Sequence, residues 1–336
     1  MIVESFHEPP PPDRARALAD FERQFTYPLG PGRSFRIEHG DDYARFYRAA
    51  GEVRCFVAVE RGWSTRGASG DFISRSEWTT FEERVLGVLA VAIRPLRLPD
   101  GGTLRAAYIG DLKVAPEARR GTALLRLARA AEEWARPRAD VAFGVVMDGT
   151  PAVPAQYTGR ASIPSFVAVT SVLVLRFSCA GACPSYDSPV NGREEDVREC
   201  FRRLSSGRHA CPPGHPAERS ATAPAWLLLP DGSACGCLED TRRAKRLVTD
   251  DGQEMVSAHL SCFAWRDLRA GAMLLRAALA RAAALGFPAL FVAVPRRDAD
   301  ALEGALKDVE VIRAPATVYA YGLPGDTDWN INSSEI

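Results

Sequence analysis

The sequence predicts an α/β (α+β) protein with two mixed central sheets, each flanked by helices, arranged in tandem. Strand-like runs rich in β-branched and aromatic residues alternate with amphipathic, helix-like runs along the chain. Residues 118–126 (ARRGTALLR) align without a gap on residues 268–276 (LRAGAMLLR), which indicates an internal repeat. A chain of 336 residues that is 46% hydrophobic can bury two cores of ordinary size.

The first half begins with prolines at positions 9–12, which favour an extended arm before a helix. The elements expected after this arm are, in chain order, helices at 13–25 and 36–51, strands at 54–62, 84–96 and 108–114, a helix from Thr122 to Trp134, and a strand at 140–147. The second half mirrors this order, with a helix at 191–205, strands at 259–265 and 288–294, and an Ala-rich helix between those strands. Small residues, Ser and Pro collect at 179–189 and mark the break. The expected division is an arm and helix (1–33), a first unit (34–178), a second unit (179–325) and a terminal tail (326–336).

One segment carries a chemical prediction, because a strand ending at Val114 leads through a turn with Gly121 into the helix that starts near Thr122. A helix N-terminus offers unpaired backbone N–H groups and the positive end of the helix dipole, which suit a phosphate or pyrophosphate. Arg119 and Arg120 add positive charge there. The same residues also fit an ordinary strand-to-helix turn with two surface arginines.

The whole stretch LKVAPEARRG resembles the signature of the GNAT superfamily of acyl-CoA-dependent N-acyltransferases. The matching residues are Leu112, Val114, Pro116, Glu117, Arg119 and Gly121. The loop departs from the family spacing: Ala118 stands where Arg or Gln is expected, or the loop is one residue short. The resemblance implies acetyl-CoA or a longer acyl-CoA as acyl donor and a primary amine as acceptor. The residues that it implies for cofactor binding are Leu112, Lys113, Val114, Arg119, Arg120, Gly121, Thr122 and Ala123. It also implies that the strands at 108–114 and 140–147 splay apart around the pantetheine arm.

Direct attack of an amine on the thioester needs a proton acceptor, an oxyanion donor and a proton for the departing thiolate. Asp111 is the first candidate for the base and Asp148 the second. The resemblance implies that the oxyanion takes a backbone N–H near Lys113 and Val114, and that a tyrosine, here Tyr157, acts as the acid. Tyr157 could instead pack under its loop or line the acceptor site, and local N–H groups could satisfy Asp111.

The second repeat lacks the Val-x-Pro-Glu lead-in, so we expect a degenerate partner unit. An inactive acyl-CoA sensor or scaffold remains an alternative function, as does a module that binds another nucleotide or phosphate. Residues 63–83 and the loop around Tyr157 could cap a tunnel for a longer acyl chain.

The balance of 42 basic and 42 acidic residues suggests neither nucleic acid nor a membrane surface as partner. With no apolar run of bilayer length and no export signal, we expect a cytoplasmic protein, monomeric or homodimeric, that acts on a small-molecule or peptide amine. The eight cysteines are then expected to be reduced. No metal is expected. Zinc bound by some of Cys179, Cys183, Cys200, His209, Cys211 and His215 is a weaker alternative.

Overall fold

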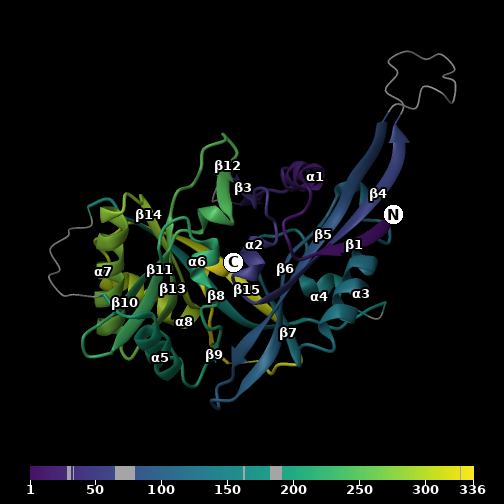
Figure 1. Cartoon of the computed structure of the whole chain (residues 1–336). Coiled ribbons are helices and arrows are strands. Elements are labelled where there is room, and N and C mark those ends of the chain that lie inside the picture. The colour runs from purple at the N-terminus through teal and green to yellow at the C-terminus, as the bar shows by residue number, and fades with distance from the viewer. Residues whose placement is uncertain (29–31, 33, 65–79, 162, 182–190, 326) are drawn as a thin grey trace.

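The computed structural model describes residues 1–28, 32, 34–64, 80–161, 163–181, 191–325 and 327–336 (Figure 1). It confirms the mixed α/β class, because helices flank a large mixed sheet. Within the described residues thirteen strands form this sheet. Their spatial order is β1 (Ile2–Phe6), β4 (Glu52–Ser64), β5 (Thr80–Arg97), β6 (Thr103–Val114), β7 (Val141–Met147), β15 (Val311–Tyr321), β8 (Val167–Ser178), β14 (Ala289–Pro295), β13 (Ala258–Trp265), β11 (Ala234–Glu239) and β10 (Ala225–Leu228), with β9 (His209–Ala210) and β16 (Trp329–Asn330) beside this path.

The two expected sheets are joined into one because the halves exchange strands. β15 of the second half lies antiparallel between β7 and β8, and β8 of the first half pairs with β14. A smaller sheet also mixes the halves, since β12 (Arg246–Thr249) pairs with β3 (Ser34–Glu38), and β3 pairs with β2 (Tyr27–Pro28). The domain limits near residues 178 and 325 therefore stay a prediction.

Two long helices cover the halves at opposite ends of the molecule (Figure 1). The helix α3 (Ala123–Ala135) packs Leu127, which is fully buried, on β4 and β5. The helix α7 (Leu268–Ala284) packs on β11, β13 and β14 in the second half. The other α-helices are α1 (Pro12–Glu22), α2 (Arg45–Arg48), α4 (Pro154–Tyr157), α5 (Glu194–Leu204), α6 (Pro216–Arg219) and α8 (Arg296–Ala305).

The strands and long helices predicted in each half are confirmed, but the predicted helix at 36–51 is wrong. That segment forms β3, a turn with Gly40 at φ +66°, and the short α2. A residue at this φ interrupts a right-handed helix, and Ile37 pairs across to Leu247 of the second half, a long-range contact that the local pattern could not reveal. Residues 65–79 of the proposed tunnel cap lie outside the described residues.

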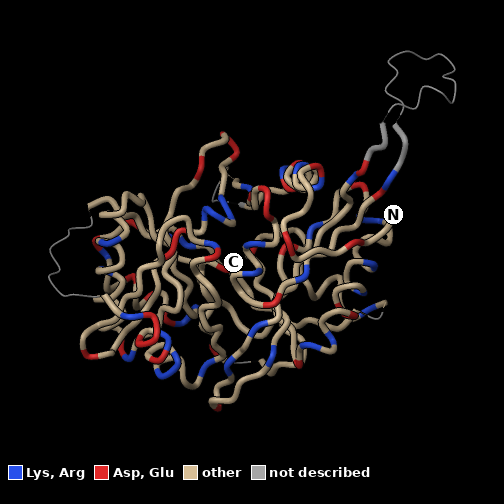
Figure 2. Tube along the Cα trace, viewed as in Figure 1, with Lys and Arg blue, Asp and Glu red and all other residues tan. Residues whose placement is uncertain are grey.

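Basic and acidic side chains are interspersed over both halves (Figure 2). This distribution agrees with the zero formal net charge. No helix among the described residues is both long and apolar enough to span a bilayer.

Candidate functional site

The strands β6 and β7 open into a V at the centre of the first half. Their parallel ladder pairs residues 106–108 with 141–143 and goes no further in the described structure, although β6 runs on to Val114 and β7 to Met147. Gly144 lies where the strands part, and a Cβ there would come within 2.8 Å of the Ile109 carbonyl oxygen. The far edge of β7 is bound to β15, which fixes one arm of the V. The splay implied by the family resemblance is therefore present.

A β-bulge lies on the β6 arm of this opening. Gly110 pairs with Ala90 and Lys113 with Val88, so two residues of β6 oppose one residue of β5. The first of the two, Asp111, has a φ of +49°, which is rare for a residue with a side chain. The bulge places Asp111 on the wall of the opening.

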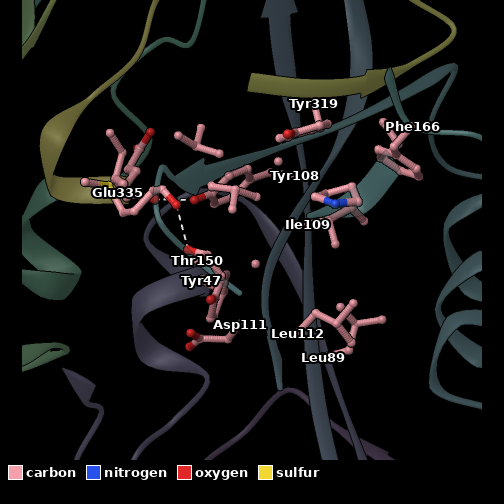
Figure 3. A pocket seen from close by; sticks show the side chains of 18 of the residues that line it. Tyr47, Leu89, Tyr108, Ile109, Asp111, Leu112, Thr150, Phe166, Tyr319 and Glu335 are labelled. Carbon is pink, nitrogen blue, oxygen red and sulfur yellow. Dashed lines mark hydrogen bonds between the residues drawn. The ribbon is translucent and has the colours of Figure 1, made fainter. Parts of the chain in front are cut away.

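A cavity of about 950 Å³ adjoins the opening (Figure 3). Its wall takes residues from β6, β7, α3 and the loop after β7, and others from the second half of the chain. The lining residues include Tyr47, Ile109, Asp111, Leu124, Ala128, Asp148, Tyr157, Phe166, His259, Ser333 and Glu335. The cavity is thus built by both halves.

Asp111 belongs to a buried cluster of charged and titratable groups. Its Oδ1 lies 3.0 Å from Lys113 Nζ, which also lies 3.3 Å from Glu22 Oε1. His39 Nδ1 lies 2.6 Å from Glu22 Oε1, and the backbone N–H of His39 donates to Glu22 Oε2 at 3.2 Å. His39 Nε2 lies 3.1 Å from Asp111 Oδ2, without the alignment of a hydrogen bond. Tyr43 donates its hydroxyl proton to Asp111 Oδ2 at 3.2 Å.

This cluster determines the charge state of Asp111. Burial would raise the pKa of the Asp111 carboxyl, but the Lys113 ammonium and His39 hold it well below its usual range. Burial likewise opposes the charge on Lys113, yet Asp111 keeps the pKa of the ammonium above its usual value. Because a carboxylate with a depressed pKa binds a proton weakly, this arrangement is unfavourable for Asp111 as a base, a role that stays a prediction.

The same cluster is the place among the described residues where three potential metal ligands meet: Glu22, His39 and Asp111 have ligand atoms within 4.8 Å of one another. Lys113 Nζ contacts both of the carboxylates and supplies positive charge between them. We assign no metal to this cluster.

The second base candidate, Asp148, lies exposed just after β7, where its Oδ1 accepts a hydrogen bond of 2.9 Å from Thr317. Tyr157 ends α4 and lines the cavity, and burial raises the pKa of its hydroxyl to about 12. Tyr157 therefore stays protonated at neutral pH, as a proton donor must.

The predicted phosphate-binding residues lie at the N-terminal end of α3. Arg119, Arg120 and Gly121 are exposed there, and the N-cap residue Thr122 makes no side-chain capping bond in the described structure. The first backbone N–H groups of α3 are thus not capped by the Thr122 side chain. Ala123 is buried, and further along α3 the side chains of Leu124 and Ala128 line the cavity.

Sequence patterns did not reveal the partners of Asp111. Glu22 and His39 come from segments more than 70 residues before Asp111, and nothing local to either marks it as functional. His259 and Glu335 join the cavity wall from the second half. The possible zinc ligands are not brought together among the described residues, because Cys179, Cys200 and Cys211 belong to three different core clusters, while Cys183 lies outside the described residues.

Comparison with solved structures shows the same fold in N-acyltransferases. N-myristoyltransferase from Saccharomyces cerevisiae with bound myristoyl-CoA superimposes with a TM-score of 0.61 at 9% identity, over 99% of this chain and 87% of that chain. A second structure of that protein with myristoyl-CoA gives a TM-score of 0.59 at 10% identity, over 100% of this chain and 83% of that one. A GCN5-related N-acetyltransferase from Anabaena variabilis gives a TM-score of 0.50 at 12% identity, over 95% and 72% of the two chains. No protein-family model and no curated protein matches the sequence. The chain therefore shares the fold of these N-acyltransferase structures.

Proposed function

We propose that this protein is an acyl-CoA-dependent N-acyltransferase that transfers an acetyl or longer acyl group to a primary amine by direct attack. The observation that carries this proposal is the V between β6 and β7, which adjoins a large cavity and has the uncapped N-terminus of α3 nearby. An acyl-CoA placed here would have its pyrophosphate near Arg119 and Arg120 and its pantetheine arm between the strands. The likeness to solved N-acyltransferases supports the same assignment.

In the proposed reaction the neutral amine attacks the thioester carbonyl, the C–N bond forms, the C–S bond breaks, and the amine loses a proton. Asp148, or Asp111 against its depressed pKa, would accept that proton. A backbone N–H near Lys113 and Val114 would bind the oxyanion, and Tyr157 would protonate the departing thiolate. The protonated state of Tyr157 supports the last role.

The cavity favours an acyl group longer than acetyl. Pockets of about 300–1,000 Å³ enclose ligands of drug size, and this cavity of about 950 Å³ lies near the upper end of that range. Much of its wall is apolar, with Ile109, Leu124 and Phe166 among the lining residues. An acyl chain of several carbons would bury apolar surface that an acetyl group cannot.

The direct test is calorimetry of the protein with coenzyme A, acetyl-CoA and a long-chain acyl-CoA. Each charged hydrogen bond to the pyrophosphate contributes about 1.5–3 kcal/mol, so Arg119→Ala with Arg120→Ala should weaken binding at least roughly tenfold. Arg129→Ala, an exposed change on α3, is the matched control and should bind as wild type. Equal affinity in all three proteins would contradict the phosphate assignment.

A thiol-release assay with a panel of primary amines then separates the enzyme from its alternative. Release that requires both an acyl-CoA and an amine supports the transferase. Tight acyl-CoA binding without release under any amine would instead favour the inactive sensor or scaffold.

A further inference from the structure

The second half of the chain contains a counterpart of the V. Among the described residues, β13 and β14 form a parallel ladder that pairs residues 258–260 with 290–292, and the β13 strand continues to Trp265. The other edge of β14 pairs with β8, just as the other edge of β7 pairs with β15. We call the region between residues 261–265 and 293–295 the second opening.

The two openings carry the same kind of bulge. Ser261 of β13 pairs with Cys237 of β11, and Ala264 pairs with Cys235. Two residues of β13 therefore oppose one residue of β11, as in the first opening. The first of the two is Cys262, whose φ of +52° matches the +49° of Asp111. Two residues with side chains hold this rare conformation at equivalent places, which identifies Cys262 as the structural counterpart of Asp111.

The second opening is occupied by the chain itself. The backbone N–H of Cys262 donates to Asn332 Oδ1 at 2.8 Å. The Ser261 and Ser334 hydroxyls lie 2.7 Å apart, and Asn330 Nδ2 donates to the Phe263 carbonyl at 3.4 Å. Asn332 is 1% exposed and Ser334 is fully buried, so the 329–335 segment fills the opening as part of the core. Figure 1 shows this end of the chain at the centre of the molecule.

The phosphate-binding end of the second unit is also altered. Two residues separate β13 from α7, and the turn that precedes α3 has no counterpart. Arg269 and Gly271, which the sequence repeat aligns with Arg119 and Gly121, lie inside α7. Asp267 caps that helix by accepting the N–H of Ala270 at 3.0 Å. A carboxylate therefore stands where a pyrophosphate would need N–H groups and positive charge.

We propose that the second opening is an acyl-CoA-type site permanently occupied by the 329–335 segment, with the Asn332 carboxamide in place of a ligand carbonyl on the bulge N–H. The protein then binds one acyl-CoA per chain, in the first opening. This inference rests on the proposed function for that first site.

The occupying segment also reaches the first cavity. Asn332 Nδ2 donates to Glu335 Oε2 at 2.9 Å, and Ser333 and Glu335 line the cavity wall. The Glu335 carboxylate lies 2.7 Å from Arg94 Nη1 and 3.0 Å from Arg219 Nη1. The Tyr108 hydroxyl donates a hydrogen bond to the backbone carbonyl oxygen of Glu335 (Figure 3). Asn332 is thus a positioning residue that connects the filled second opening to the wall of the first cavity.

The first test is the stoichiometry of acyl-CoA binding, measured by calorimetry on the full chain. We expect one molecule per chain in the wild type, and one bound at least roughly tenfold more weakly in the Arg119→Ala, Arg120→Ala variant. Two molecules per chain in either protein, or one bound by the variant with wild-type affinity, would overturn the inference. No binding to the wild type would instead remove the proposed function.

The second test needs no substrate, so it decides whether Asn332 occupies the second opening even if no acyl-CoA binds. Amide hydrogen exchange of Cys262, followed by NMR, should be slow in the wild type and lose its protection in Asn332→Ala. Equal protection in both proteins would show that Asn332 does not occupy the bulge N–H. Where Asn332→Ala fails to fold, exchange of the wild type alone decides, because a Cys262 amide that exchanges as fast as an exposed one would contradict the assignment.

The third readout distinguishes a positioning role from general loss of structure. If the amine binds at the wall that Ser333 and Glu335 form, Asn332→Ala should raise the amine KM and leave the acyl-CoA dissociation constant at the wild-type value. Equal weakening of both would contradict a positioning role on the amine side.

Discussion

Replacing Lys113 with methionine tests whether the buried charge cluster is held together as the structure indicates. The Lys113 side chain is 3% exposed, and its ammonium contacts the carboxylates of Asp111 at 3.0 Å and Glu22 at 3.3 Å. Methionine has similar bulk but no charge, so it leaves two buried carboxylates with His39 as their remaining basic neighbour. Removing one partner of a buried ion pair costs about 3–5 kcal/mol. The unfolding equilibrium should therefore shift by roughly 150- to 5,000-fold.

The assay is urea unfolding followed by tryptophan fluorescence at pH 7, with Lys307→Met, an exposed change, as the matched control. The variant should lower the midpoint with an unchanged slope, since the area exposed on unfolding is the same. A midpoint equal to that of Lys307→Met would refute the reasoning.

The pH dependence of the free energy of unfolding tests the same charge cluster independently. The folded pKa values of Asp111 and Glu22 are lowered, so the wild-type cluster contributes stability above the unfolded pKa of about 4, and this is lost as pH falls through the folded values. In Lys113→Met those pKa values rise, and protonation of a carboxyl at mildly acidic pH relieves the unpaired charge. The stability gap between variant and wild type should narrow from pH 7 toward pH 5. A gap that widens would contradict this account.

Three further predictions concern single residues. Gly110→Ala places a Cβ 2.5 Å from the Tyr47 hydroxyl oxygen, so it should lower the free energy of unfolding by about 1–3 kcal/mol in the same urea assay. Gly304→Ala in α8 meets no atom within 4 Å and should stabilise the protein by roughly 0.5–1 kcal/mol; destabilisation there would count against the helix assignment. Tyr157→Phe should leave acyl-CoA affinity unchanged and slow turnover by about 10²–10⁴-fold if Tyr157 is the acid, and unchanged turnover in the thiol-release assay would remove it from the mechanism.

The sequence by itself determined the elements whose evidence is local. The strand ending at Val114, the turn at Gly121 and the helix after Thr122 follow from residue spacing and turn chemistry, and each lies where the pattern predicts. The tandem order was also visible, because the repeated motif and the strands around it recur in the second half. These features need contacts between neighbours in the chain and little else.

The tertiary structure decided the features that depend on distant pairing. The segment at 36–51 has a helical pattern, but Ile37 pairs with Leu247 and the strand β3 forms instead. In the second repeat, the residues aligned with Arg119 and Gly121 lie inside α7 because that helix starts sooner after its strand. The sequence similarity indicated the repeat, but it did not indicate that these residues lie within a helix in the second copy.

The contacts of the candidate site depend most clearly on distant parts of the chain. Asp111 was recognisable from its place beside the motif, yet the groups that set its pKa, His39 and Lys113 among them, meet through the packing of three segments. Asn332 reaches Cys262 across 70 residues of chain. Local patterns constrain backbone geometry over a few residues, whereas a charge state or an occupied opening depends on which distant side chains share one buried space.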